Sequence, residues 1–316
     1  MRIVKLPCRV VIVTAFALGL ATPAFAQAPA TAPLVIHLPS SARTAALGNA
    51  WVAGRDAEVI FYNPAQLIGA RQEFGVSISR PGPAGTALSA ASTFAAGKMS
   101  LTLGWGVQAV GFSVDPAAPY PYTTDVLLTR GDADGHSALL TFGGAIVYKN
   151  FRIGGAGKYV TDVASGLGPA SGVSVNQHAW LADIGVARNV LGGVAAFSVQ
   201  NLGRTTPASP SNLTTPRQFL AGWSTARATG PLDLGLYSQV TMRDDWISPA
   251  GGIDVGYSWI EGYAIAFRLG ARRPETTSEH PVTLGAAFTA DRLTIEYAVQ
   301  FFDGGRTANG VTVRWR

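Results

Sequence analysis

Residues 231–242 read PLDLGLYSQVTM, and their apolar and polar side chains alternate along the chain. A period of two is the period of a β-strand, whose successive side chains point to opposite faces. The same alternation recurs in residues 252–259, 262–269 and 293–301. A helix with this pattern would scatter its apolar residues around its axis. These segments therefore predict strands with one apolar and one polar face.

Strand-like segments of this kind fill the chain from residue 72 to its last residue. Two alternatives to fourteen strands stay open, a barrel of twelve strands and a soluble β-sandwich or propeller, because their strands also alternate. We expect fourteen strands, at 72–80, 86–95, 98–114, 134–149, 151–161, 178–188, 193–201, 217–226, 230–242, 248–258, 261–271, 281–289, 291–303 and 308–316.

The connections between these segments alternate in length. Long connections are expected at 115–133, 162–177, 202–216 and 272–280, whereas the intervening turns hold one to four residues. Bacterial outer-membrane barrels have short periplasmic turns and longer extracellular loops. The pattern predicts an all-β, antiparallel transmembrane β-barrel, with both chain ends in the periplasm.

The first 26 residues have the three parts of a secretory signal peptide. Basic residues lie within the first nine positions, residues 10–20 are apolar, and Ala24-Phe25-Ala26 forms an A-x-A cleavage site. We expect cleavage near Ala26 and export to the outer membrane of a Gram-negative-type bacterium. An uncleaved anchor is the alternative, but the apolar run is shorter than the roughly twenty residues that a spanning helix needs.

Composition excludes several other classes of protein. The only cysteine, Cys8, lies in the predicted signal peptide, so the mature chain has no disulfide. Removal of three basic residues with the signal leaves 21 basic and 19 acidic residues, so the formal net charge of the mature chain is +2. This small charge suggests no nucleic-acid partner. Beyond the signal, no run approaches eighteen apolar residues, which excludes helical spanning segments.

The sequence does not support an enzyme. It lacks a G-x-S-x-G elbow, and its four histidines have no serine or aspartate partner at a recognisable spacing. Residues 154–158 read GGAGK, but Tyr159 stands where a phosphate-binding loop needs Ser or Thr. We expect no catalytic residue, no metal and no cofactor.

The segment before the first strand carries a family resemblance. Residues 42–53 read ARTAALGNAWVA, Asp56 follows, and residues 63–67 read NPAQL. This resembles the N-terminal motif of the PorV/PorQ family and, more distantly, of FadL-type transporters of hydrophobic compounds. Further along the chain, DIGV at 183–186 and QNLG at 200–203 resemble the D-x-G and Q-N-L-G motifs of PorV-like barrels. Gln66 departs from the pattern, since relatives commonly have Gly there, and the chain is shorter than typical FadL-type transporters.

The resemblance implies that residues 27–71 form a hatch inside a barrel that spans residues 72–316. A short helix is expected near 45–53, with Trp51 buried. Asn63 and Pro64 are expected to form a turn rather than to contact a ligand. The hatch charges either pair with lumen-facing charges or stay solvated in the lumen. The hatch charges are Arg43, Arg55, Asp56 and Glu58, and the expected lumen-facing charges are Asp183, Asp233, Asp254, Arg268, Glu296 and Arg314.

Two functions follow from the resemblance. The first is a FadL-like channel for uptake of apolar or amphipathic small molecules. The second is a PorV-like scaffold that moves no solute and engages proteins of a type IX-like secretion system at its outer rim. One apolar loop would serve either role, or would simply fold over the barrel mouth. Its candidate ligand or partner residues are Tyr120, Tyr122, Val126, Leu127 and Leu128. Outer-membrane lipid is the other expected partner.

Overall fold

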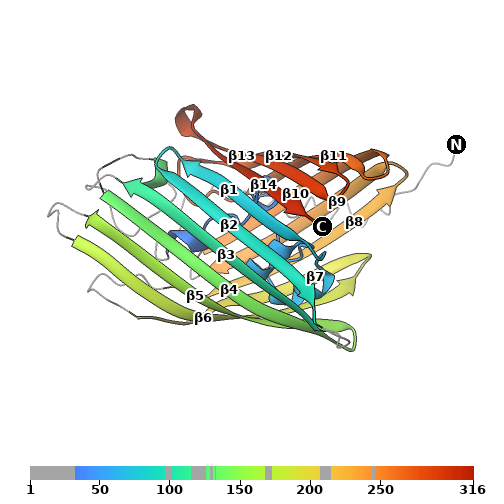
Figure 1. The fold of residues 1–316 in the computed structure, drawn as a ribbon, viewed down its shortest axis with the longest axis horizontal. Helices are drawn as coiled ribbons and strands as arrows, with labels where there is room; N and C mark the ends of the chain where they lie inside the picture. Colours follow the sequence, from blue (N-terminus) through green and yellow to red (C-terminus); the bar gives the residue numbers. More distant parts are fainter. Residues whose placement is uncertain are drawn as a thin grey trace.

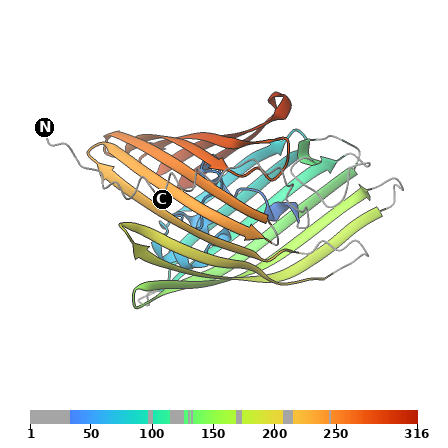
Figure 2. The same cartoon turned by 180° about the vertical axis from the view of Figure 1, so that it is seen from behind.

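The computed structural model describes residues 33–96, 101–114, 126–128, 131, 133–167, 173–206, 215–243 and 246–316. Fourteen antiparallel strands form one closed barrel, in which each strand pairs with its neighbours in sequence and β1 pairs with β14 (Figures 1 and 2). The expected fold and strand number are confirmed. The strands are β1 (Phe74–Gly82), β2 (Gly85–Ala95), β3 (Leu101–Val114), β4 (Ala133–Tyr148), β5 (Phe151–Leu167), β6 (Val173–Val190), β7 (Gly193–Thr206), β8 (Gln218–Thr229), β9 (Leu232–Arg243), β10 (Trp246–Ile260), β11 (Tyr263–Arg272), β12 (Glu279–Ala290), β13 (Leu293–Phe302) and β14 (Thr307–Trp315).

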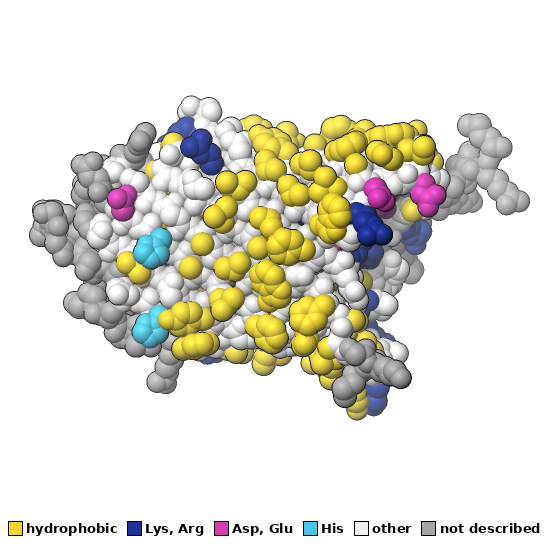
Figure 3. Space-filling view, in the orientation of Figure 1, with side chains coloured by type: hydrophobic (Ala, Val, Ile, Leu, Met, Phe, Trp, Pro, Cys, Tyr) yellow, Lys and Arg dark blue, Asp and Glu magenta, His cyan; other side chains and the backbone are white. Residues whose placement is uncertain are grey.

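The alternation in the sequence becomes an apolar outer wall and a polar inner wall. In β13, Ile295 and Tyr297 are exposed on the outside, whereas Glu296 is fully buried inside the barrel. Hydrophobic side chains form a broad band around the middle of the face in Figure 3. An apolar band outside a polar lumen is the pattern of a barrel that spans a membrane.

The two ends of the barrel differ. At one end, which we call the turn end, the hairpins β4–β5, β6–β7, β8–β9, β10–β11 and β12–β13 close with two-residue turns. β1 begins and β14 ends there, since Phe74 pairs with Trp315. The other end, which we call the loop end, carries the connection between β3 and β4, with residues 126–128 forming a short 3₁₀ helix, η4.

One expected loop is wrong. Residues 162–167 and 173–177 continue the hairpin of β5 and β6, where Asp162 pairs with Gln177 and accepts a hydrogen bond from its side chain at 3.2 Å. The strands therefore extend further toward the loop end than expected. Asp162 and Gln177 form a polar pair within the hairpin, and the pairing continues past them, with Ala164 opposite Val175.

Residues 33–71, which we call the N-terminal segment, pack inside the barrel. Their elements are η1 (Leu34–Ile36), α2 (Ala42–Ala46), η2 (Ala57–Phe61) and η3 (Pro64–Gly69). The helix lies earlier than expected, because Ser41 and Thr44 form a capping box at its start. It ends where Gly48 and Asn49 adopt positive φ values of 65° and 64°. No helix in the described part of the chain is long and apolar enough to cross a membrane.

Candidate functional site

The N-terminal segment docks on the wall where the wall has no side chain. A Cβ at Gly252 of β10 would lie 2.7 Å from Leu47 Cδ2, and one at Gly270 of β11 would clash with the backbone of Gly48. Gly48 is equally constrained, because its own Cβ would lie 2.7 Å from the Ala271 carbonyl oxygen. The Leu-Gly pair of the ARTAALG motif therefore requires glycines on two neighbouring strands.

The NPAQL motif docks in the same way on the opposite side of the barrel. A Cβ at Gly185 of β6 would clash with Asn63 Oδ1, and one at Gly154 of β5 would clash with Pro64 and Ala65. Asn63 Oδ1 accepts a hydrogen bond from the Ala65 amide at 3.0 Å, which caps η3. These contacts give Asn63 and Pro64 a structural role at the wall.

A β-bulge explains the second pair of motifs. Gln200 and Asn201 of β7 lie opposite the single residue Asp183 of β6, and Asn201 has a φ of 60°. Asp183 accepts a hydrogen bond from the Asn201 amide at 2.9 Å and forms an ion pair with Lys158 at 2.6 Å. Gln200 points inward with Ser198, every second residue of β7, and its Nε2 donates to the Phe61 and Tyr62 carbonyls at 2.8 and 2.7 Å.

A buried charge cluster joins the N-terminal segment to the last strands. Arg314 of β14 is fully buried and contacts four carboxylates, those of Asp56, Glu58, Glu73 and Glu296. Its Nε lies 2.8 Å from Glu296 Oε2, and its Nη2 lies 3.2 Å from Asp56 Oδ2. Hatch and wall charges expected from the sequence thus pair directly. The sequence did not single out Glu73. It directly precedes β1, and its side chain points inward like those of alternate residues in that strand.

Arg43 extends the cluster from the N-terminal segment. Its Nη2 lies 2.6 Å from Glu296 Oε1, and Arg268 Nη2 lies 3.1 Å from the same oxygen. Arg268 also holds Asp254 at 3.1 Å. Burial acts to lower the pKa of Arg43, but the charges of Glu296, Asp56 and Asp254 together outweigh it and the net pKa is raised. Arg43 therefore remains a cation inside the lumen.

Three of the carboxylates lie close enough to suggest a metal site. Ligand oxygens of Asp56, Glu58 and Glu73 lie within 4.8 Å of one another, and all three residues are buried. Arg314 contacts each of them, so its guanidinium group supplies positive charge where a metal ion would. Burial raises the pKa of Glu58 well above its ordinary value, and the charge of Arg314 opposes this shift.

The middle of the N-terminal segment closes the lumen. Gln239 Oε1 of β9 accepts the backbone amides of Trp51 and Val52 at 2.9 and 2.7 Å. The Trp51 indole is 1% exposed, as expected, and donates to Asp56 Oδ1 at 2.8 Å. Its ring packs against Tyr237 with a centroid distance of 5.0 Å. These contacts fix a floor between the two ends of the barrel.

Open chambers lie on both sides of this floor. The loop-end chamber has a cavity volume of about 70 Å³, and its walls include Lys158, Arg243 and Trp246. The turn-end chamber has a cavity volume of about 590 Å³, and both Asp233 and Asp254 line it. Among the residues that the structure describes, none lines both chambers.

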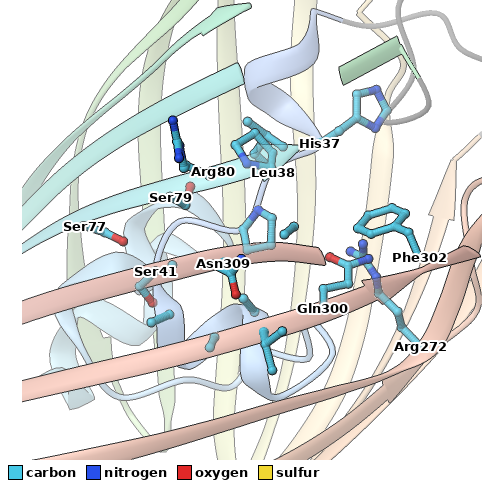
Figure 4. A pocket seen from close by; sticks show the side chains of 18 residues that line it. His37, Leu38, Ser41, Ser77, Ser79, Arg80, Arg272, Gln300, Phe302 and Asn309 are labelled. Atoms are coloured by element: carbon cyan, nitrogen blue, oxygen red, sulfur yellow. The ribbon is translucent and has the colours of Figure 1, made fainter. Parts of the chain in front are cut away.

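A third space lies between the N-terminal segment and the wall at the loop end. Its cavity volume is about 50 Å³, and it is bounded by β1, β13 and β14 on the wall side. Figure 4 shows His37 and Leu38 on one side of this recess and Gln300 and Phe302 on another. Several further lining residues are small or apolar, namely Pro39, Ala42, Ala45, Pro81, Ala298, Val299 and Ala308.

The predicted apolar loop is described only in part. Tyr120 and Tyr122 lie outside the described residues, and Val126 begins η4. Leu127 and Leu128 are buried, and the Leu127 carbonyl accepts the Ala84 amide between β1 and β2 at 3.2 Å. These two leucines therefore pack on the barrel rim, which matches the alternative of a loop folded over the mouth.

Comparison with known proteins identifies the fold. No protein-family model matches the chain, and no curated protein matches it in sequence. Among solved structures, the toluene transporter TbuX of Ralstonia pickettii gives a TM-score of 0.55 at 14% identity, over 87% of this chain and 98% of that chain. The toluene transporter TodX of Pseudomonas putida gives 0.53 at 10% identity, over 87% and 96%.

A TodX deltaS2S3 mutant, described as a monoaromatic hydrocarbon channel, gives a TM-score of 0.57 at 11% identity, over 87% of this chain and 97% of that chain. Identities this low establish the fold alone. The chain is therefore a closed, fourteen-stranded antiparallel β-barrel whose fold is similar to that of these transporters.

Proposed function

We propose that the protein is a channel for uptake of apolar or amphipathic small molecules across the outer membrane. The observation that carries this proposal is a lumen closed midway by residues 47–67, with open chambers on both sides of the closure. In this proposal the signal at 1–26 is removed, the N-terminal segment is the hatch, the loop end faces outward, and the turn end faces the periplasm.

The recess beside the N-terminal segment suits an apolar guest. Small-molecule sites are mostly apolar concavities with a few polar groups that orient the ligand. Leu38, Val299 and Phe302 provide apolar surface, and Arg272 and Gln300 provide polar groups. The fold shared with transporters described as carrying toluene supports the same class of solute.

Uptake of labelled toluene by a Gram-negative host that lacks such a channel tests this proposal. Cells that produce the protein should take up toluene faster than cells with an empty vector. Ala308→Trp should abolish the gain, because the indole would fill the recess. Ala221→Trp is the matched control, since Ala221 is exposed on the outer face of β8. Equal uptake with and without the protein would refute the channel.

The secretion scaffold remains a prediction of the sequence. It relies on the apolar loop presenting an outward surface, yet Leu127 and Leu128 are 0% and 7% exposed. No observation in the described part of the chain favours it over the channel.

A further inference from the structure

Buried N–H groups without an acceptor gather at one place in the barrel. Buried donors in native proteins nearly always have a partner, so each exception needs an explanation. Seven side-chain nitrogens in the described part of the chain are buried without a hydrogen bond, and four of them belong to three adjacent residues. The four are His37 Nε2, Arg243 Nε, Arg243 Nη2 and Trp246 Nε1. His37 Nε2 is a donor in the tautomer in which Nδ1 accepts from Arg243 Nη1.

The three residues form one surface in the loop-end chamber. Arg243 of β9 and Trp246 of β10 are paired neighbours in the barrel register, and each is 4% exposed. His37 reaches them from the N-terminal segment, with Nδ1 2.8 Å from Arg243 Nη1. All three line the same chamber. We call them the donor cluster.

The carboxylates in the described part of the chain do not satisfy the donor cluster. Glu275 contacts it, with Oε2 3.2 Å from His37 Nδ1. The same oxygen is 3.6 Å from Arg243 Nη2, which is beyond hydrogen-bonding distance. Glu279 is occupied by Arg272 at 2.8 Å.

Two further arginines lie near the donor cluster. Arg273 stacks over the Trp246 ring, 3.7 Å from its centroid. Arg272 lines the same chamber and pairs with Glu279.

We propose that the donor cluster binds the carboxylate of a small amphipathic organic acid. Only an acceptor satisfies N–H donors, and an ionised carboxylate accepts without donating. Arg and indole N–H groups shielded from solvent form strong charge-assisted hydrogen bonds with such a group. The inference rests on the proposed uptake function and assigns its solute class.

The rest of the chamber matches the other half of such a molecule. Leu139, Leu220 and Phe61 line it beside the donor cluster. An aromatic or short aliphatic body would lie against these side chains while its carboxylate meets Arg243. A neutral hydrocarbon would leave the donor cluster unpaired and gain nothing from it.

Calorimetric titration of the full-length protein in detergent, with benzoate and its neutral isostere benzamide, tests the inference. Benzoate should bind at least about tenfold more tightly, since only its carboxylate carries charge to the donor cluster. Equal affinities for benzoate and benzamide would overturn the carboxylate site.

Three substitutions should change benzoate affinity in different directions. Trp246→Phe removes one N–H but keeps the ring, so binding should weaken by about fivefold to tenfold. Arg243→Gln should weaken it by about a hundredfold. Glu275→Gln should strengthen it, because it removes the carboxylate that competes for Arg243. Trp259→Phe, on the exposed outer face of β10, should leave it unchanged.

The site would be refuted if Trp246→Phe and Glu275→Gln both bound benzoate with the affinity of the unchanged protein. This test holds even if Arg243→Gln fails to fold. The outcome is separable from that of the uptake experiment. Toluene uptake without a preference for benzoate would reject only the donor cluster. Benzoate binding that obeys these substitutions, without any uptake, would reject only the channel.

Discussion

Arg43 Nη2 lies 2.6 Å from Glu296 Oε1, although the two residues are 253 positions apart in the chain. Arg43 belongs to α2 and Glu296 to β13, so this ion pair ties the N-terminal segment to the closing strands of the barrel. Glu296 also holds Arg314 and Arg268. One wall carboxylate thus contacts three guanidinium groups.

Replacement of this carboxylate should destabilise the barrel strongly. Glu296→Gln leaves Arg43, Arg268 and Arg314 with one counter-charge fewer inside the lumen, and breaking a buried pair costs about 3–5 kcal/mol. The temperature at which the folded band disappears on an SDS gel should fall accordingly. Glu261→Gln, in the exposed β10–β11 turn, is the control and should have no effect. An unchanged transition in Glu296→Gln would show that the cluster contributes nothing to stability.

A methyl group at Gly185 should displace the NPAQL motif. The Cβ would clash with Asn63 Oδ1, and forced overpacking typically costs about 1–3 kcal/mol. Gly185→Ala should therefore lower the thermal midpoint and make the peptide bonds near Asn63 cleavable by protease. Gly157→Ala is the control, because nothing described lies within 4 Å of its Cβ position. Equal protease resistance in both variants would contradict the docking role of Gly185.

The wall could be predicted from the sequence because its signal is local. Alternation in residues 231–242 needs no knowledge of distant residues, and β9 forms there (Leu232–Arg243). The ends of strands were less predictable. Asp162 and Gln177 form a polar pair within the β5–β6 hairpin, so the apolar signal is interrupted there although the strand pairing continues.

The interior was predictable only where a charge had to face inward. Glu296 and Arg314 lie on the polar face of alternating strands, so the alternation predicts that their side chains point inward. Their ion-pair partners could not be predicted, since the sequence does not show which of the hatch charges reaches them. The donor cluster had no sequence signal, because the sequence does not show that His37 reaches the β9–β10 hairpin that holds Arg243 and Trp246.

Loss of the Gln239 side-chain amide should open a leak through the floor. Its Oε1 accepts two buried amides, those of Trp51 and Val52, and each unsatisfied buried donor costs about 1–3 kcal/mol. Gln239→Leu should raise single-channel conductance in planar bilayers. Gln72→Leu, exposed at the turn end, serves as the matched control. If Gln239→Leu stays as closed as the unchanged protein, these two hydrogen bonds do not hold the floor.

Acid should weaken the contact between the β11–β12 loop and the N-terminal segment. Burial acts to raise the pKa of Glu275, but hydrogen bonding to His37 and the charges of Arg243 and Arg272 outweigh it, so the net pKa is lowered. A carboxyl with a lowered folded pKa adds stability above its unfolded pKa of about 4.3. That stability is lost as the pH falls through the folded value.

The thermal midpoint should therefore drop between pH 7 and pH 3 by more in the unchanged protein than in Glu275→Gln. At pH 7 the variant should be the less stable of the two, and the difference should narrow as the pH falls. Other carboxylates titrate in both proteins, so only this difference reports on Glu275. A difference that stays constant from pH 7 to pH 3 would show that the ionised Glu275 does not stabilise the contact with His37 and Arg243.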